Sequence, residues 1–309
     1  MKNYNSNIKK SISYLKNNDC VGIPTETVYG LAANAYSDIA ISKIYKLKKR
    51  PTSNPLIVHY HSLESLRRDC KINKNFLKLY KKFCPGPLTF ILKLKKNSLI
   101  SKKVTNGGTS LAIRFPKHQL IRKILKEINF PLAAPSANIS TSISPVTKQD
   151  VFDEFGKNIK YILDGGRSKI GLESTILDLT TIPKLIRLGG LNILKIERFL
   201  NCNFSYKRKI SLNYPGQSKI HYSPGIPIKL NIKKPKKHSA YLLISKKKGK
   251  NKNFFYLTKN KNLDEAGKNL YNILRQIKKK KYKLIEVEKI PNTGMGLAIN
   301  DRLLRASAK

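Results

Sequence analysis

Short polar clusters follow apolar segments along the first two thirds of this sequence, and most of their side chains are cations, hydroxyls or amides. The clusters are Thr25, Thr27 and Tyr29; Lys48 and Arg50; Asn54 and His59; Ser110 and Arg114; Ser136 and Asn138; and Ser174 and Thr175. Arginine presents a planar fork to a carboxylate or phosphate, lysine supplies a point charge, and hydroxyls and amides add oriented hydrogen bonds. The set therefore predicts a pocket for an anionic ligand.

Each cluster also has a structural explanation when it is taken alone. Serine and threonine cap helices, Asn138 can support a turn, Arg114 can be a surface charge, and His59 can be a satisfied sheet residue. For any single cluster this structural explanation is the simpler one. Only the combination of clusters argues for a ligand site.

Several common catalytic and nucleotide-binding motifs are absent. Gly166–Gly171 has the glycine spacing of a Walker A loop, but Leu172 and Glu173 stand where lysine and serine or threonine are required. The sequence has neither a Gly-x-Gly-x-x-Gly nor a His-Glu-x-x-His motif, and its five histidines lack metal-ligand spacing. Ser136 lies outside any Gly-x-Ser-x-Gly elbow. We therefore expect no protein-bound catalytic metal and no hydrolase triad.

The chain is strongly basic. Its 309 residues include 62 Lys and Arg against 18 Asp and Glu, a formal net charge of +44. Such a charge attracts nucleic acids and other anions. However, the excess is mostly lysine spread along the whole chain beside abundant Asn and Ile, and no basic motif is interleaved with aromatic residues. We interpret the lysine runs at 233–237, 246–252 and 278–281 as solvated surface.

Apolar periodicity places the polar clusters on a sheet. Helical spacing is present at Ile8–Leu15, from Ser37 or Asp38 to Leu47, and at 119–128 and 147–155. Strand-like segments lie at 20–23, 56–60, 88–94, 110–115, 131–135, 161–163, 176–179 and 185–188. The predicted fold class is α/β, with a twisted mixed sheet and flanking helices.

A second, smaller module follows. Periodicity fades between about Phe204 and Pro227, a stretch with Pro, Gly, Ser and Tyr that is typical of a linker. Beyond it, strands are predicted at 241–244, 254–257 and 284–287 around a helix at 263–277, with a last helix at 296–306. This pattern indicates a Rossmann-like βαβ unit. We expect a catalytic domain at 1–203, a linker at 204–228 and a small α/β domain at 229–309.

The sequence also bears on cellular location. No segment approaches the roughly 20 apolar residues that span a bilayer, and Met1–Lys10 lacks the apolar stretch of a secretory signal. Cys20, Cys70, Cys84 and Cys202 form no Cys-x-x-Cys pair, which disfavours a zinc cluster and a disulfide framework. We expect a cytoplasmic protein with no membrane partner, and cysteines that are small, mostly buried hydrophobic residues.

Longer motifs connect several of the clusters in order. They are PTETVYGL at 24–31; Lys48, Arg50, Pro51, Pro55 and Leu56; CPGPLT at 84–89; Ser136 and Asn138 in APSAN; GLEST at 171–175 with IRLG at 186–189; YPG at 214–216 with HYSP at 221–224; and GMGLAINDRLLR at 294–305. In these motifs the sequence resembles the YrdC-like family, in the long two-domain form of the threonylcarbamoyl-adenylate synthases. The resemblance covers nearly the whole chain.

The resemblance implies a reaction in which L-threonine, bicarbonate and ATP give threonylcarbamoyl-AMP and pyrophosphate, for modification of tRNA next to the anticodon. It assigns Lys48 and Arg50 to the carbamate and triphosphate oxygens, with Ser136 and Asn138 orienting the same group. L-Threonine would be held by Thr27, His59, Arg114 and Ser174. ATP, with Mg²⁺ held through its phosphates, would be bound by Arg50, Asn54, Ser110, Ser136, Ser144, Arg187 and Tyr222.

The resemblance also implies partners and a lid. A separate tRNA threonylcarbamoyl transferase would accept the adenylate, direct but weak binding of tRNA stays open, and His221–Pro224 would fold over the nucleotide. Two alternatives remain at this point. One is a basic module that binds structured RNA without catalysis, and the other is a carbamoyltransferase, which is weaker because such proteins carry further domains.

Overall fold

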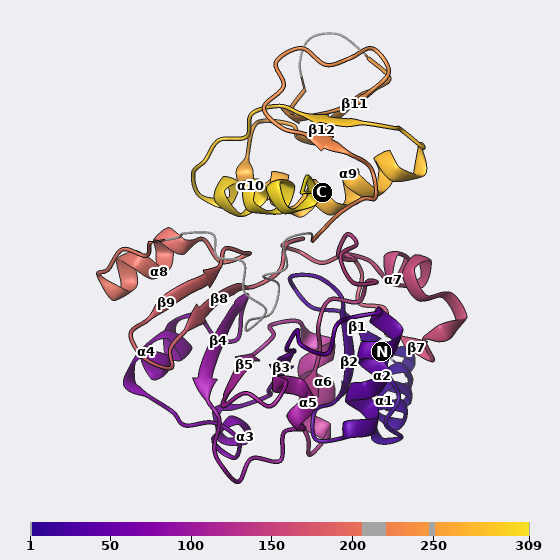
Figure 1. Cartoon of the computed structure of the whole chain (residues 1–309). Helices are drawn as coiled ribbons and strands as arrows, with labels where there is room; N and C mark the ends of the chain where they lie inside the picture. Colours follow the sequence, from indigo (N-terminus) through magenta and orange to yellow (C-terminus); the bar gives the residue numbers. More distant parts are fainter. Residues whose placement is uncertain (1, 206–220, 247–250, 309) are drawn as a thin grey trace.

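The protein folds around two separate β-sheets (Figure 1). The computed structural model describes residues 2–205, 221–246 and 251–308, with the side chains described from residue 5 onward. Within these residues, nine strands between 21 and 187 form one sheet and four strands between 228 and 287 form the other. The Tyr214–Gly216 part of the predicted linker and part of the 246–252 lysine run lie outside the described residues.

The larger sheet is mixed, as the sequence predicted. Its strands, in spatial order, are β7 (Tyr161–Ile162), β1 (Val21–Ile23), β2 (Gly30–Asn34), β6 (Leu132–Ala133), β3 (Ile57–His59), β5 (Ser110–Arg114), β4 (Leu88–Lys93), β8 (Thr175–Asp178) and β9 (Lys184–Arg187). The pairs β1–β7, β3–β5 and β4–β8 are parallel, and the other neighbours are antiparallel. In the β3–β5 register His59 pairs with Arg114, so two of the predicted site residues end adjacent strands.

Helices cover this sheet. They are α1 (Lys2–Lys16), α2 (Asp38–Lys48), α3 (Leu63–Arg67), α4 (Lys74–Phe83), α5 (Lys102–Thr105), α6 (Gln119–Glu127), α7 (Lys148–Phe155) and α8 (Ile193–Leu200), with a 3₁₀ turn at Gly156–Asn158. The Ser37 side chain accepts from the Ala40 N–H and caps α2, and Lys49 ends that helix in the left-handed region. The predicted helices at 119–128 and 147–155 are confirmed.

The smaller sheet is parallel throughout. Its spatial order is β10 (Ile228–Lys229), β13 (Ile285–Val287), β11 (Ala240–Ser245) and β12 (Phe254–Thr258). Helix α9 (Leu263–Lys279) connects β12 to β13, and α10 (Met295–Ala306) follows β13. Parallel strands joined by such a crossover helix confirm the predicted α/β character of this unit. Both helices lie on the side of the sheet that faces the first domain (Figure 1).

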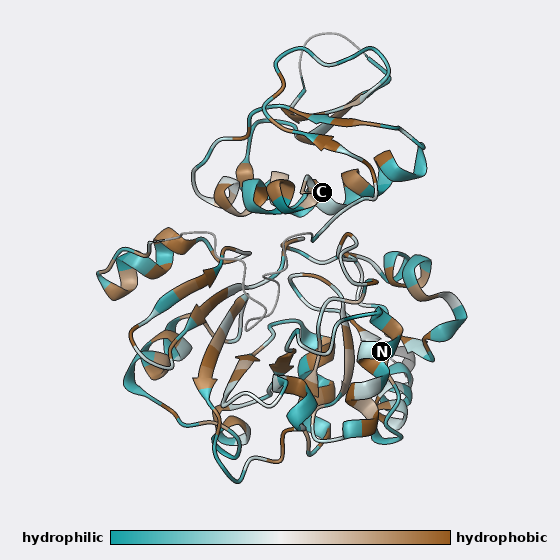
Figure 2. Cartoon of the chain, in the orientation of Figure 1, coloured by the Kyte–Doolittle hydropathy of each residue, from teal (hydrophilic) through white to brown (hydrophobic). Residues whose placement is uncertain are grey.

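The two units share one apolar core. Figure 2 shows apolar residues along the strands and polar residues on the outer turns of the helices. The largest buried cluster contains Leu172 of the first unit together with Leu270 and Met295 of the second. A Cβ at Gly171, where φ is +78°, would lie 2.6 Å from the Lys268 carbonyl oxygen, so the close approach requires glycine there.

Some local predictions were wrong. Residues 30–34 form strand β2, where no strand was predicted, and its small apolar residues are buried between β1 and β6. Cys202 is exposed just after α8, whereas Cys20 and Cys70 are buried as expected. None of the described helices has the length and apolar character that crossing a membrane requires.

Candidate active site

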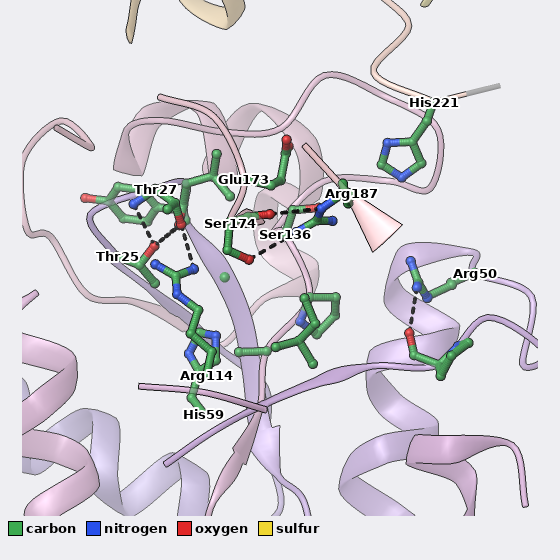
Figure 3. Close-up of a pocket in the computed structure, with 17 residues that line it drawn as sticks. Thr25, Thr27, Arg50, His59, Arg114, Ser136, Glu173, Ser174, Arg187 and His221 are labelled. Carbon is green, nitrogen blue, oxygen red and sulfur yellow. Dashed lines mark hydrogen bonds between the residues drawn. The ribbon is translucent and has the colours of Figure 1, made fainter. Parts of the chain in front are cut away.

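A cavity lies at one edge of the larger sheet, and the empty space in it and in its opening to solvent is about 570 Å³. Seven of the predicted site residues line it together: Thr27, Arg50, His59, Arg114, Ser136, Ser174 and Arg187. Figure 3 shows that these side chains come from both sides of the cavity and point toward a common space.

One side of the cavity is built around an ion pair between Glu26 and Arg114. The Arg114 guanidinium donates from Nη2 to Glu26 Oε1 at 2.5 Å, from Nη1 to Thr27 Oγ1 at 2.7 Å and from Nε to the Gly86 carbonyl at 3.2 Å. Burial alone would raise the pKa of Glu26, but Arg114 outweighs it and lowers that pKa. We call Glu26, Thr27, His59 and Arg114 the Glu26 wall.

Thr27 is oriented by its neighbour Thr25. The Thr25 hydroxyl donates to the Val28 carbonyl at 2.6 Å and lies 2.9 Å from Thr27 Oγ1. Because the Thr25 hydrogen is used in this way, Thr27 donates to Thr25 and accepts from Arg114. Tyr29 fixes the same loop from the other side, since its hydroxyl donates to Gly166 O at 2.7 Å.

His59 completes this wall at the end of β3. Its side chain is 2% exposed, and its Nδ1 has no hydrogen-bond partner among the described residues. Burial and the nearby Arg114 hold the pKa of His59 well below its usual range, so the imidazole is neutral at physiological pH. A neutral ring with an unpaired buried nitrogen is suited to a ligand hydrogen bond.

Lys48 lies behind the cavity rather than on its lining. Its Nζ donates to the carbonyl oxygens of Ser136 at 2.6 Å and Asn138 at 2.5 Å, so it holds the loop that follows β6. The lysine is 1% exposed, and burial lowers the pKa of its ammonium well below the usual value. Two of its three N–H donors are thus used by carbonyls of this loop.

Asn138 supports the same loop. Its Nδ2 donates to the carbonyls of Ile139 and Ser142, and its Oδ1 is buried without a partner in the described part of the chain. The Ile139 N–H donates to Glu154. The loop therefore presents Ser136 to the cavity on a backbone that is fixed from three directions.

Arg50 follows the last turn of α2 and is held by Asn54. Its Nη2 donates to Asn54 Oδ1 and to the Pro55 carbonyl at 2.9 Å, and its Nε donates to the Asn54 carbonyl at 3.0 Å. Burial and the nearby Arg187 lower the pKa of Arg50 to about 10, which still leaves it charged at neutral pH. Asn54 thus orients Arg50, and the remaining Nη1 is available to an anion.

The opposite side of the cavity is formed by Glu173, Ser174 and Arg187, which we call the Glu173 wall. Arg187 donates from Nη2 to Ser174 Oγ and from Nε to the Ser174 carbonyl, both at 3.1 Å (Figure 3). Ser174 Oγ also lies 2.7 Å from Thr89 Oγ1. The Glu173 carboxylate accepts from Ser144, and from Tyr271 and Arg302 of the second domain.

The predicted lid segment begins beside this wall. His221 lines the cavity, and Tyr222 is fully buried behind it with φ at +65° and no partner for its hydroxyl among the described residues. The Tyr222 ring lies edge-on to His221 and stacks on Tyr271. The Ser223 N–H donates to the Thr141 carbonyl at 2.8 Å.

Six of the predicted site residues do not line the cavity. Lys48, Asn54, Asn138 and Tyr222 are buried next to residues that do, and Ser144 donates to Glu173. Ser110 begins β5, at the opposite end of that strand from Arg114. The structure therefore brings all four residues assigned to chemistry into one connected region, with Ser110 the most separate of the set.

Sequence reasoning assigned no role to Glu26 or Glu173, and it placed His221 in the lid only. Glu173 and His221 line the cavity, and Glu26 holds the lining residue Arg114. The sequence did contain a feature that could have indicated the two carboxylates. Only 18 of 309 residues are acidic, and one of them lies inside each of the motifs PTETVYGL and GLEST. A buried carboxylate beside arginines fixes the direction of the guanidinium groups.

The chemistry of the cavity is that of an anion site. Arg50, Arg114 and Arg187 all line it, and the two carboxylates are each paired with a buried arginine. Among the described residues, no group of three or more His, Cys, Asp and Glu side chains is placed to hold a metal ion. Such a site can hold several anionic groups together and stabilise charge during their reaction.

Comparison with known proteins places the chain in a family. A family model described as telomere recombination matches residues 13–189, and one described as threonylcarbamoyl-AMP synthase, C-terminal domain, matches residues 191–308. Threonylcarbamoyl-AMP synthase of Pyrococcus abyssi is 34% identical over 97% of this chain and 94% of its own length. The protein of that name from Bacillus subtilis is 35% identical over 97% and 92%.

A solved structure agrees with these sequence relatives. The crystal structure of P. abyssi Sua5 complexed with L-threonine has a TM-score of 0.89 and 32% identity, and covers 97% of this chain and 94% of that one. These matches do not favour a non-catalytic RNA-binding module. The chain belongs to the threonylcarbamoyl-AMP synthase family, in its two-domain form.

Proposed function

We propose that the cavity converts L-threonine, bicarbonate and ATP into threonylcarbamoyl-AMP and pyrophosphate. The observation that carries this proposal is the meeting of Arg50, Arg114 and Arg187 in one cavity, where the lining carboxylate Glu173 and the neighbouring Glu26 are already paired with arginines. Three reactants that bear a carboxylate, a carbonate and a triphosphate repel one another in solution. Fixed guanidinium groups offset that repulsion.

L-Threonine binds at the Glu26 wall in this proposal. Arg114 offers the remaining hydrogens of its guanidinium to the α-carboxylate, since Glu26 and Thr27 fix its orientation from the other edge. The neutral His59 and Ser174 take the polar groups at the other end of the amino acid. The crystal structure of the P. abyssi protein is described as a complex with L-threonine, which supports L-threonine as the ligand.

ATP binds toward Arg50 and the Glu173 wall. Arg50 and Arg187 contact its phosphates, and Ser136 donates to the reacting group. Asn54 and Ser144 act mainly by holding Arg50 and Glu173 in place. We keep Ser110 and Tyr222 as nucleotide contacts. Magnesium enters with the triphosphate, because the described cavity offers cations and paired carboxylates rather than a set of free oxygen ligands.

The reaction proceeds in two steps. The threonine ammonium and bicarbonate give the carbamate, one water and one proton. A carbamate oxygen then attacks the α-phosphorus of ATP, the new P–O bond forms, and the bond to pyrophosphate breaks. Lys48 and Arg50 stabilise the charge that gathers on the carbamate and phosphate oxygens, while Ser136 and Asn138 orient them. No covalent enzyme intermediate is required.

The segment from His221 to Pro224 serves as a lid. It joins the proposed catalytic domain at 1–203 to the small domain at 229–309, as part of a linker at 204–228. His221 lines the cavity and the Ser223 N–H bonds to the loop after Asn138. A covered site protects the mixed anhydride from water. The product then passes, in the cytoplasm, to a separate tRNA threonylcarbamoyl transferase.

The test is product analysis with ¹⁴C-bicarbonate. The purified chain is incubated with ATP, Mg²⁺ and labelled bicarbonate, with and without L-threonine, and nucleotides and pyrophosphate are quantified. We expect labelled threonylcarbamoyl-AMP and an equal amount of pyrophosphate only when L-threonine is present. Salt-sensitive RNA binding without threonine-dependent pyrophosphate release would instead support the RNA-binding module.

A further inference from the structure

One arginine of the second domain reaches the back of the cavity wall. Arg302 lies on α10 and is 1% exposed. Its Nε donates to Glu173 Oε2 at 2.8 Å, and its Nη2 donates to the Leu188 carbonyl at 2.9 Å, just beyond Arg187. Its guanidinium carbon also lies 4.7 Å from the centre of the Tyr222 ring. A single side chain therefore touches the Glu173 wall and the lid segment.

Within the described residues, the Glu173 carboxylate has two further donors, one from each domain. Tyr271 on α9 donates to Glu173 Oε1 and Oε2 at 3.0 and 2.9 Å. Within the first domain, Ser144 donates to Oε1 at 2.5 Å. Arg302 is itself held by Asp301, which accepts from its Nη1 at 2.7 Å. The countercharge that directly contacts this pocket carboxylate thus comes from the second domain.

We propose that Arg302 is a positioning residue for ATP. Arg302 neutralises Glu173 and fixes both the Glu173 wall and Tyr222. This inference rests on the proposed function and extends it. It assigns to the second domain the completion of the nucleotide half of the cavity. Arg302 need not touch substrate, because it acts through a carboxylate that lines the cavity and through a ring that lies behind His221.

The physical argument concerns an uncompensated buried charge. Without Arg302, Glu173 would remain in the cavity wall as a carboxylate with weaker compensation, facing the triphosphate. Removing one partner of a buried ion pair leaves such a charge, and its repulsion acts over several ångströms. Of the residues proposed for L-threonine, only Ser174 belongs to the Glu173 wall, and Thr27, His59 and Arg114 belong to the Glu26 wall. L-Threonine binding should therefore change much less than ATP binding.

The pKa of Glu173 supports this argument. Burial alone would raise it, but Arg302 and Arg187 outweigh burial and lower it to about 2. The other ionisable groups coupled to this carboxylate are Tyr222, Tyr271 and His221. Loss of Arg302 raises the pKa of Glu173 toward the pH range of assays. The variant should therefore recover ATP binding as the pH falls and Glu173 becomes protonated.

The experiment is a double-mutant cycle on the full chain, with ATP in Mg²⁺ buffer as the probe. The dissociation constant of ATP is measured by calorimetry for wild type, Arg302→Gln, Glu173→Gln and the double variant. We expect Arg302→Gln to weaken ATP binding about 5- to 150-fold, the usual range of such couplings. We expect Glu173→Gln, added to Arg302→Gln, to restore most of that loss, because it removes the unpaired charge.

Three further variants or measurements separate positioning from simple packing. Arg302→Lys retains the charge and should bind ATP more tightly than Arg302→Gln. Arg167→Gln removes another domain contact, since Arg167 donates to the Lys268 carbonyl and to Asn269 but does not contact Glu173. It should leave ATP binding near wild type. The Arg302→Gln variant should also bind ATP more tightly at pH 5.5 than at pH 8, relative to wild type.

The possible results decide the matter either way. If the double variant binds ATP as poorly as Arg302→Gln, the neutralisation of Glu173 is refuted and Arg302 acts through packing. If Arg302→Gln does not fold, the dissociation constant of ATP is compared between Arg302→Lys alone and Arg302→Lys in the Glu173→Gln background. The same two outcomes then decide between neutralisation of Glu173 and packing. Because ATP binding is read without turnover, a wild-type chain that binds ATP but makes no adenylate would overturn the proposed function and leave this cycle interpretable.

Discussion

Both walls of the cavity contain a buried ion pair between a carboxylate and an arginine, but the arginine comes from a different domain in each. Each places a buried carboxylate against a buried arginine: Glu26 against Arg114, and Glu173 against Arg302. In the Glu26 wall both partners belong to the larger sheet and its loops. In the Glu173 wall the arginine comes from α10 of the second domain, 129 positions along the chain.

This difference separates two kinds of pre-organisation. The Glu26 wall is fixed by the first domain, because its arginine ends β5 and its loop is bonded to neighbouring first-domain residues. The Glu173 wall has first-domain contacts through Ser144 and Arg187, but its carboxylate takes its ionic partner Arg302 from α10 and a further donor, Tyr271, from α9. The wall proposed for L-threonine is thus built within the first domain, whereas the wall proposed for ATP also depends on contacts from the second domain.

The largest expected effect comes from the residue that belongs to neither wall. Arg50→Ala should reduce threonylcarbamoyl-AMP formation about 10²- to 10³-fold, because one fixed cation beside the reacting oxygens is lost. Within the described part of the chain Arg50 donates to Asn54 and to the Pro55 carbonyl, both in the loop that follows α2, so the fold should persist. Pyrophosphate release with saturating substrates measures the rate, and circular dichroism checks the fold. A near-normal rate would remove Arg50 from the chemistry.

A smaller effect tests the independence of the Glu26 wall. Arg114→Gln should weaken the binding of L-threonine by about 2 kcal/mol or more, roughly 30-fold in the dissociation constant, because the ion pair with the substrate carboxylate is lost. ATP affinity should remain within a few-fold of wild type, which is the reverse of the pattern expected for Arg302→Gln. Calorimetric titrations with each ligand measure both. Equal losses for L-threonine and ATP would mean that the two walls act as one unit.

The contrast also explains what the sequence could predict. Polar clusters after apolar segments included Thr27, His59, Arg114 and Ser174, and the family resemblance assigned these residues to L-threonine. All four line one cavity. The same reasoning could not reveal the role of Arg302. Its position was included in a motif, but its partner Glu173 lies 129 residues away, and contact across domains leaves no local pattern.

Lys48 illustrates a second limit of sequence reasoning. Its motif placed it near the chemistry, and its Nζ is indeed bonded to the Ser136 and Asn138 carbonyls. Residue type and spacing do not tell whether a lysine points into a cavity or holds the loop beside it. Only the path of the chain after β6, which brings those carbonyls over the end of α2, decides this.

The smallest expected effect at neutral pH concerns the acid stability of the domain contact. The pKa of Glu173 falls from 4.5 to about 2 on folding, against burial, through Arg302 and Arg187. A carboxyl with a depressed pKa contributes stability that is complete above its unfolded pKa and is lost as the pH falls through its folded pKa. Its contribution is therefore constant from pH 8 to about 5.5 and declines between about 4.5 and 2.

Urea unfolding of wild type and Glu173→Gln at pH 7, 5.5, 4 and 3 measures the difference in unfolding free energy. That difference should be the same at pH 7 and 5.5 and should shrink at pH 4 and 3. A difference that already shrinks between pH 7 and 5.5 would mean that Glu173 titrates near neutrality, and the docked second domain would then not hold this carboxylate ionised.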